Sequence, residues 1–163
     1  MTSAPFYVAQ LDGVHNRIAF SSGSGPLDQY VREQVTQDVR RRVAACFVAV
    51  ATDQRIAGYY TLAAASLMLA DLPASIGKKL PRYPTVPAVR MGRLAVDEAF
   101  KGQGLGSALL ADALDRAAHS EIAAYALMVD AKDDSAAAFY QHHGFIALPD
   151  SPLILFLPLA TIG

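Results

Sequence analysis

Three glycines at alternate positions constrain this chain more than any other feature. They lie in the segment Lys101-Gly102-Gln103-Gly104-Leu105-Gly106-Ser107, which follows the apolar run Val89–Val96. The segment after them has apolar residues at i, i+3, i+4 and i+7, namely Leu110, Ala113, Leu114 and Ala117. This order predicts a strand over 89–96, a glycine turn, and a helix from Gly102 to about Ala118.

A glycine turn at the start of a helix favours the binding of an anion. The first N–H groups of a helix have no partner inside it, and the helix dipole is positive there. Glycine accepts a positive φ and lets the backbone approach a ligand closely. Residues 102–107 are therefore candidates for binding a pyrophosphate. Neither the G-x-G-x-x-G pattern of dinucleotide folds nor the P-loop pattern is present. The alternative is a turn with only a structural role.

The remaining segments predict a mixed sheet with helices. Helices are expected at Leu27–Arg42, Leu72–Leu80 and Ser135–His143, and strands at Val43–Ala51, Ile56–Ala63, Tyr125–Asp130, Phe145–Leu148 and Leu153–Leu157. Thr52–Arg55 joins the first two strands as a hairpin turn. Pro81, Pro84 and Pro87 argue against regular structure before Ala88. We expect Asp134 to cap the last helix and Gly144 to end it. The class is α/β or α+β in a single domain, 1–163.

Composition excludes several classes of protein. The chain has 163 residues, a net charge of −1, 53% hydrophobic residues and one cysteine. It is therefore neither disordered, nor wholly basic, nor built on disulfides. The longest apolar stretch, Ile56–Ala70, is too interrupted for a membrane span. Because the N-terminus lacks a signal peptide pattern, we expect a cytoplasmic protein. His142 and His143 diverge on a helix without a third ligand, so we expect no metal.

The charge is unevenly distributed. Residues 78–101 carry six basic and two acidic side chains, whereas residues 102–163 carry two basic and seven acidic ones. Such a basic stretch beside the glycine turn predicts that the protein binds a polyanion. The alternative is that these side chains are ordinary solvated surface charges. The candidate contacts are Arg32, Arg40, Arg41, Arg42, Lys78, Lys79, Arg82, Arg90 and Arg93. Arg93 lies in a predicted strand, so pairing with a carboxylate is its alternative role.

Two aromatic residues mark the last helix. Phe139 and Tyr140 are adjacent and point about 100° apart, so one can enter the core while the other faces a cleft. Tyr140 could equally be a core residue with a satisfied hydroxyl. Cys46 lies within a predicted buried strand and is expected to be inert. The sequence thus offers no activated nucleophile.

The glycine turn and the tyrosine helix together resemble the GNAT superfamily of acyl-CoA N-acetyltransferases. That family carries Gln/Arg-x-x-Gly-x-Gly/Ala, matched by Lys101-x-x-Gly104-x-Gly106, and a late helix matched by Phe139-Tyr140 and Gly144-Phe145. The resemblance covers about residues 40–158 and implies a mixed sheet with a splayed strand pair that holds acetyl-CoA. Lys101 departs from the pattern because it keeps a donor but loses planar geometry.

Further segments resemble one branch of that family, the acetyltransferase toxins of bacterial toxin–antitoxin modules. They are Leu27-Asp28-x-Tyr30, Gly58–Leu62, Gly92–Asp97 and Val129–Asp134. The resemblance implies acetylation of the α-amino group of aminoacyl-tRNA, which blocks translation. It also implies a ribbon-helix-helix antitoxin that takes the pair to operator DNA. A homodimer through Leu62–Leu72 is an open alternative to burial of these residues in one core.

The resemblance also assigns roles to residues. Acetyl-CoA is the co-substrate, with its pyrophosphate on Gly102, Gln103, Gly104, Leu105, Gly106 and Ser107 beside Lys101, and its pantetheine along Leu94, Ala95 and Val96. Tyr140 would protonate the departing thiolate. A free α-amine, with a pKa near ~8, is easier to deprotonate than a lysine near ~10.4, which favours an aminoacyl ester as acceptor. The alternatives are a GNAT enzyme for a small amine or a protein N-terminus, and a non-catalytic module that binds CoA or a partner.

Overall fold

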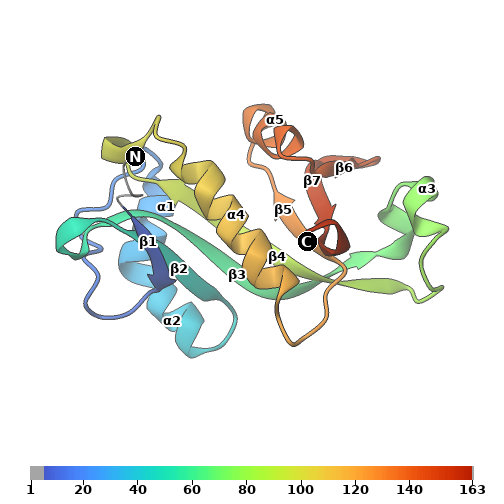
Figure 1. Ribbon diagram of the computed structural model, residues 1–163, viewed down its shortest axis with the longest axis horizontal. Coiled ribbons are helices and arrows are strands. Elements are labelled where there is room, and N and C mark those ends of the chain that lie inside the picture. The colour runs from blue at the N-terminus through green and yellow to red at the C-terminus, as the bar shows by residue number, and fades with distance from the viewer. Residues whose placement is uncertain (1–5, 163) are drawn as a thin grey trace. The chain divides into compact units, whose positions relative to one another are not determined.

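Seven strands form a mixed sheet in the computed structural model, which describes residues 6–162 (Figure 1). The strands are β1 (Tyr7–Gln10), β2 (Ala45–Val50), β3 (Ile56–Met68), β4 (Thr85–Val96), β5 (Ala126–Asp130), β6 (Ile146–Leu148) and β7 (Ser151–Pro158). The helices are α1 (Gly25–Gln29), α2 (Val35–Arg40), α3 (Ala74–Gly77), α4 (Leu105–Ala118) and α5 (Asp134–His142). A π-helical turn, η1 (Tyr30–Gln34), joins α1 to α2, and η2 (Thr52–Gln54), η3 (Leu69–Asp71), η4 (Glu98–Phe100) and η5 (Leu159–Thr161) are 3₁₀ turns.

The strand order is β1-β2-β3-β4-β5-β7-β6. The pair β4/β5 is parallel, whereas β1/β2, β2/β3, β5/β7 and β6/β7 are antiparallel. The predicted mixed sheet is therefore confirmed, as is the hairpin of β2 and β3. The chain divides into two compact units, one made of residues up to Ala63 with Gly92–Ala113, the other of Ala64–Met91 with the residues from Leu114 onward.

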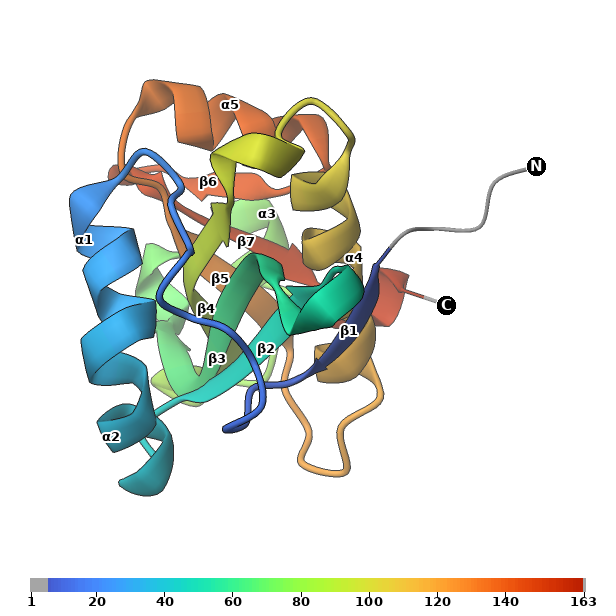
Figure 2. The ribbon, with the colours of Figure 1, turned by 90° about the vertical axis from the view of Figure 1, so that its left-hand side faces the viewer.

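The first unit has helices on both faces of its strands (Figure 2). Side chains of a strand alternate between faces. On β3, the Tyr59 hydroxyl donates to the Leu27 carbonyl at 2.6 Å, on the side of α1, and the next residue, Tyr60, hydrogen-bonds to Asp112 of α4. The core under α1, η1 and α2 contains the buried residues Phe20, Tyr30, Val31, Val35, Cys46, Val48, Val50, Ile56, Tyr59 and Ala95.

Glycine brings α4 close to this sheet. A Cβ at Gly58 would lie 2.8 Å from Leu109 Cδ1 and 2.9 Å from the Ala95 carbonyl oxygen. Since real Cβ atoms do not come so close to backbone, any larger residue at Gly58 would push α4 or β4 away. The predicted apolar helix face is confirmed, because Leu109, Leu110 and Ala113 are buried.

The first helical stretch ends earlier than predicted. Residues 25–40 are helical throughout, with a π turn in the middle, so the helix ends two residues before the predicted end at about Arg42. Arg42 adopts φ +61°, its N–H donates to the Val39 carbonyl, and the Val43 N–H donates to the Asp38 carbonyl. These two bonds form a Schellman motif, which ends the helix although the left-handed residue is not glycine.

The second unit packs α3 and α5 around β5, β7 and β6. Its core contains Leu67, Leu72, Val86, Ala88, Ala126, Met128, Leu148 and Phe156. The predicted stop of α5 at Gly144 is confirmed, because Gly144 has φ +92° and the Phe145 N–H donates to the Tyr140 carbonyl. The predicted cap is wrong by one residue, since it is the carboxylate of Asp133 that accepts from the Ala136 N–H at 2.8 Å.

Other boundaries also differ from the prediction. β3 continues to Met68, and the short helix expected over 72–80 is confined to Ala74–Gly77. β4 begins at Thr85 although Pro87 follows, because Pro87 lacks only a donor and its carbonyl accepts the Tyr125 N–H at 2.8 Å. β1 was not predicted, since four residues carry little periodic pattern. Among residues 6–162 no helix is long and apolar enough to cross a membrane.

Candidate active site

The glycine turn combines two left-handed residues with a helix start. Gly102 has φ +79° and Gly104 has φ +77°, and α4 begins at Leu105. The predicted helix start at Gly102 is therefore wrong by three residues, because left-handed residues cannot continue a right-handed helix. The Ala108 N–H donates to the Gly104 carbonyl at 3.0 Å, which closes the first turn. Gly106 differs from the other two, since it lies inside that turn.

The turn is open on its outer side. A Cβ placed on Gly102 or on Gly104 would meet no atom of residues 6–162 within 4 Å. Lys101, Gly102, Gln103 and Gly104 are exposed, whereas Leu105 is buried and anchors the helix start. The N–H groups of Leu105 and Gly106 have no acceptor inside the helix because no residue precedes them at i−4 within it. This arrangement can bind an anion.

A buried carboxylate fixes the backbone before the turn. Asp97 is 2% exposed and caps η4, accepting from the Ala99 N–H at 2.9 Å. It also accepts from the Ser21 N–H at 3.0 Å and pairs with Arg55 at 3.4 Å. Arg55 in turn lies over the Phe100 ring at 5.2 Å. The local sequence pattern assigns no role to Asp97, because Arg55 and Ser21 are 42 and 76 residues away.

Lys101 also connects the glycine turn to the loop that contains Ser21 and Ser22. Its Nζ donates to the Ser22 carbonyl at 2.6 Å. The carboxylate of Asp28, which is buried, accepts from both the N–H and the hydroxyl of Ser22, at 2.9 and 2.7 Å. The residues around Ser22 are thus held from two sides. The donor that Lys101 retains in place of glutamine or arginine therefore has a backbone partner, and this contact does not need planar geometry.

The end of β4 leads into this turn. The parallel register with β5 runs from Ala88 to Met91, and the strand continues to Val96. In its last part Ala95 is buried, whereas Leu94 and Val96 are half-buried. The following N–H, of Asp97, donates to the Ala57 carbonyl at 2.8 Å.

Tyr140 lies on the buried face of α5. It is 8% exposed, and its ring contacts Phe139 and Phe145 with centroid distances of 5.3 and 5.5 Å. Burial raises the pKa of Tyr140 to about 12. Within residues 6–162 its hydroxyl makes no hydrogen bond. The ring thus serves the core while the oxygen keeps both its proton and its capacity to donate.

Comparison with known proteins identifies the family of the chain. The model of the acetyltransferase (GNAT) family matches residues 14–145. The chain belongs to the GNAT acetyltransferase family. A curated relative, the "tRNA-acetylating toxin" of Mycobacterium tuberculosis, is 39% identical over 157 residues, which cover 95% of this chain and 91% of the relative. The predicted family, the fold and the acetyltransferase activity are confirmed.

Solved structures match over almost the whole chain. AtaT complexed with acetyl-methionyl-tRNAfMet is 28% identical with a TM-score of 0.89 and covers 96% of both chains. AtaTR bound with AcCoA is 28% identical with a TM-score of 0.83, covering 97% of this chain and 96% of that one. The KacTA–DNA complex is 26% identical with a TM-score of 0.80, covering 96% and 95%.

The basic candidates of this GNAT acetyltransferase fall into both units. Arg32, Arg40 and Arg93 lie in the first unit, and Lys78, Lys79, Arg82 and Arg90 in the second. Some have protein partners: Arg32 donates to the Phe20 carbonyl and Arg90 pairs with Asp130. The alternative role of Arg93, pairing with a carboxylate, has no counterpart among residues 6–162, where its guanidinium lies over the ring of Tyr30, 3.5 Å from the centroid.

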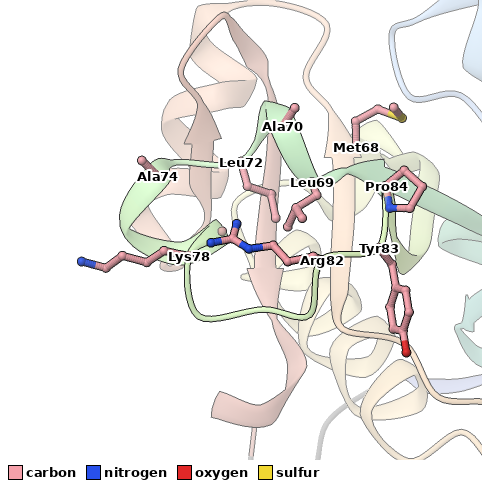
Figure 3. Close-up of a pocket in the computed structure, with 10 residues that line it drawn as sticks. Met68, Leu69, Ala70, Leu72, Ala74, Lys78, Arg82, Tyr83 and Pro84 are labelled. Atoms are coloured by element: carbon pink, nitrogen blue, oxygen red, sulfur yellow. The ribbon is translucent and has the colours of Figure 1, made fainter.

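Two basic residues share a cavity in the second unit. This cavity of about 590 Å³ is lined by Met68, Leu69, Ala70, Leu72, Ala74, Gly77, Lys78, Arg82, Tyr83 and Pro84. Figure 3 shows the guanidinium of Arg82 near Leu72, while the ring of Tyr83 points away from both. Met68 and Tyr83 are 50% and 70% exposed, so this surface is partly apolar as well as basic.

Cys46 and the histidines do not form a reactive centre in the described residues. Cys46 is free and 1% exposed, and burial raises the pKa of its thiol to about 12. The thiol thus stays protonated at neutral pH and is a poor nucleophile, as predicted. In residues 6–162 no group of three or more histidine, cysteine, aspartate or glutamate side chains could hold a metal ion.

Proposed function

We propose that this acetyltransferase is a toxin that transfers the acetyl group of acetyl-CoA to the α-amino group of aminoacyl-tRNA and so blocks translation. The observation that carries the proposal is the open turn at Gly102 and Gly104, which leads into α4, in a chain 39% identical to a tRNA-acetylating toxin. The turn alone indicates only an enzyme that binds acetyl-CoA. The similarity to a tRNA-acetylating toxin is what favours aminoacyl-tRNA as the acceptor of the acetyl group.

The residues of the turn fit the pyrophosphate of acetyl-CoA. Among residues 6–162 no atom lies within 4 Å of a Cβ placed on Gly102 or Gly104. An anion bound there would meet the free N–H groups at the start of α4 and the positive end of its dipole. We infer that residues 102–107 hold the pyrophosphate, and that Leu94, Ala95 and Val96 offer backbone groups to the pantetheine. The end of the β4/β5 register at Met91 supports this role for the strand end. When bound, acetyl-CoA supplies the acetyl group as an activated thioester.

Tyr140 is the proposed general acid. It can donate a proton to the sulfur that leaves as the amine takes the acetyl group. Its raised pKa keeps the phenol protonated at neutral pH, and no protein acceptor among residues 6–162 competes for the proton. No covalent enzyme intermediate is required, which agrees with the inert Cys46.

The acceptor chemistry favours an α-amine. An aminoacyl ester lowers the pKa of its amine below the ~8 of a free α-amino group, so a fraction is neutral without a strong base. Basic side chains supply the attraction for tRNA, chiefly through phosphates. We propose Arg40, Lys78, Lys79 and Arg82 as phosphate contacts, because they are exposed.

The partners follow from the same proposal. A toxin of this kind requires a neutralising antitoxin, and we propose a ribbon-helix-helix protein that carries the pair to operator DNA. A solved KacTA–DNA complex 26% identical to this chain supports that assembly. A homodimer is a second proposed assembly. Since charged tRNA is its substrate, we place the protein in the cytoplasm.

The test is an acetyl transfer assay with labelled acetyl-CoA. Charged tRNA, uncharged tRNA, a polyamine and a peptide with a free N-terminus are offered separately. Label on charged tRNA alone supports the proposal. Label on the polyamine or the peptide in preference to charged tRNA would assign a different acceptor. Binding of acetyl-CoA without any transfer would reduce the protein to a CoA-binding module.

A further inference from the structure

Arg93 has an unusual setting for a charged residue. It lies on β4, one residue before Leu94, and is half-buried with its guanidinium 3.5 Å from the centre of the Tyr30 ring. Within residues 6–162 it forms neither an ion pair nor a hydrogen bond. One flat face of the cation is thus covered by an aromatic ring, and its charge has no anionic partner.

The surroundings form a small pocket. Its volume is about 310 Å³, and it is lined by Pro26, Leu27, Gln29, Tyr30, Glu33, Gln34 and Arg93, all from the first unit. This volume lies at the lower end of small-ligand sites, ~300–1,000 Å³. The pocket is therefore suited to one ring-sized group and its immediate substituents.

The other polar side chains that line the pocket come from α1 and η1, and they already have hydrogen-bond partners. The Gln29 amide donates to Glu33 at 3.1 Å, the Gln34 amide donates to Asp38 at 3.3 Å, and the Tyr30 hydroxyl donates to Asp38 at 2.8 Å. The guanidinium of Arg93 is the one charged group lining the pocket that lacks such a partner in the described chain. Arg93 is therefore the group of this pocket that can attract an anion, whereas Glu33, which also lines the pocket, is already bonded to Gln29.

A π-helical turn holds the aromatic platform. The Val35 N–H donates to the Tyr30 carbonyl, five residues back, which inserts an extra residue into the helical turn at this point. Tyr30 is 5% exposed, and burial, followed by its hydrogen bond to Asp38, raises the pKa of its hydroxyl. The ring is therefore neutral and presents its π face to the cation.

We propose that this pocket binds an unpaired nucleotide of single-stranded RNA, with its base stacked on the open face of the Arg93 guanidinium and its phosphate attracted by the same charge. Guanidinium planes are common stacking partners for unpaired bases. The inference rests on the proposed function, in which the ligand is the single-stranded 3′ end of tRNA. The place of Arg93, directly before the strand segment 94–96, puts such a nucleotide beside the proposed acetyl site.

A short RNA ending in a fluorescent base analogue tests the proposal without acetyl-CoA. The probe is the trinucleotide CCA with 2-aminopurine in place of the terminal adenine. Stacking quenches this fluorophore, so we expect quenching on titration with the wild-type protein. Arg93→Lys keeps the charge but loses the plane. We expect it to weaken binding about tenfold and to remove most of the quenching.

Controls separate stacking from charge and from folding. Arg116→Lys makes the same change at an exposed arginine of α4 outside the pocket and should leave quenching unchanged. Far-ultraviolet circular dichroism and the melting temperature establish that Arg93→Lys is folded. Equal affinity and equal quenching for wild type and Arg93→Lys would overturn the proposal. So would displacement of the quenched probe by an acidic peptide but not by unlabelled CCA, which would assign the pocket to a protein partner.

The transfer assay distinguishes this failure from failure of the proposed function. If charged tRNA is acetylated but the probe shows no Arg93-dependent quenching, the pocket proposal fails and the function stands. If the probe is quenched but charged tRNA is not acetylated, the function fails and the nucleotide pocket stands. If the proposed function and the nucleotide pocket are both correct, Arg93→Lys should raise KM for aminoacyl-tRNA more than it lowers kcat.

Discussion

The buried carboxylate of Asp97 accepts a hydrogen bond of 3.0 Å from the backbone N–H of Ser21. This bond joins the segment before the glycine turn to a loop that is 76 residues earlier in the chain. The Glu98 N–H donates to the Ser21 carbonyl at 2.8 Å, so the two segments exchange hydrogen bonds in both directions. The Asp97 carboxylate is therefore one of the groups that position the turn, together with the backbone bond from Glu98 and the side-chain bond from Lys101 to the same loop.

Replacing Asp97 by alanine should therefore destabilise the protein. The change leaves the N–H groups of Ser21 and Ala99 without an acceptor, and we expect a loss of about 2–4 kcal/mol in the free energy of unfolding. Urea denaturation measures this loss. Asp71→Ala removes an exposed aspartate and should change stability by less than about 0.5 kcal/mol. Equal stability of the two variants would contradict the role of Asp97.

Gly104→Glu should abolish acetyl-CoA binding. The new side chain would occupy the open space outside the turn and place a negative charge against the pyrophosphate, which we expect to weaken binding at least about 100-fold. The φ of +77° adds about 1–2 kcal/mol of backbone strain. Calorimetric titration with acetyl-CoA measures the affinity. Gly13→Glu, at an open site without positive φ, is the matched control, and retained affinity in Gly104→Glu would place the pyrophosphate elsewhere.

Tyr140→Phe should lower kcat by about 10²–10⁴-fold while the affinity for acetyl-CoA remains nearly unchanged. The ring contacts with Phe139 and Phe145 survive the change, so folding should be retained. Because burial raises the pKa of Tyr140 to about 12, loss of the acid should not limit the wild-type rate below pH 10. Tyr125→Phe, at another tyrosine of the second unit, is the control. An unchanged kcat would remove Tyr140 from the mechanism.

The stability of the protein should fall in alkali partly through Cys46. Burial raises the pKa of this thiol from 9.0 to about 12, so its contribution to stability is complete below pH 9 and is lost as the pH rises toward 12. At pH 10.5 wild type should have lost about 2 kcal/mol relative to pH 8 through this group. Cys46→Ala should lack that part of the decrease. Urea denaturation at both pH values measures it, and parallel decreases would contradict the assignment.

Local patterns in the sequence predicted the parts of the fold that depend on neighbouring residues. The i, i+3, i+4 spacing identified α4, the alternation of turn and apolar run identified the β2/β3 hairpin, and Gly144 marked the end of α5. These signals are readable because helix periods, hairpin turns and C-terminal caps involve residues within a few positions of one another. The glycine turn belongs to the same class, and with the tyrosine helix it also indicated the family.

The sequence alone determined that a helix starts after a glycine turn, that the chain forms a mixed sheet flanked by helices, and that it resembles acetyl-CoA enzymes. The tertiary structure decided what Arg93, Asp97 and Lys101 do. Their partners are the ring of Tyr30, the Ser21 N–H and the Ser22 carbonyl, between 63 and 79 residues away. Which distant groups meet depends on strand order and on helix packing, and no local period encodes either. A charged residue in a sequence therefore indicates an electrostatic role, but only its folded surroundings determine whether its partner is a carboxylate, a carbonyl or an aromatic ring.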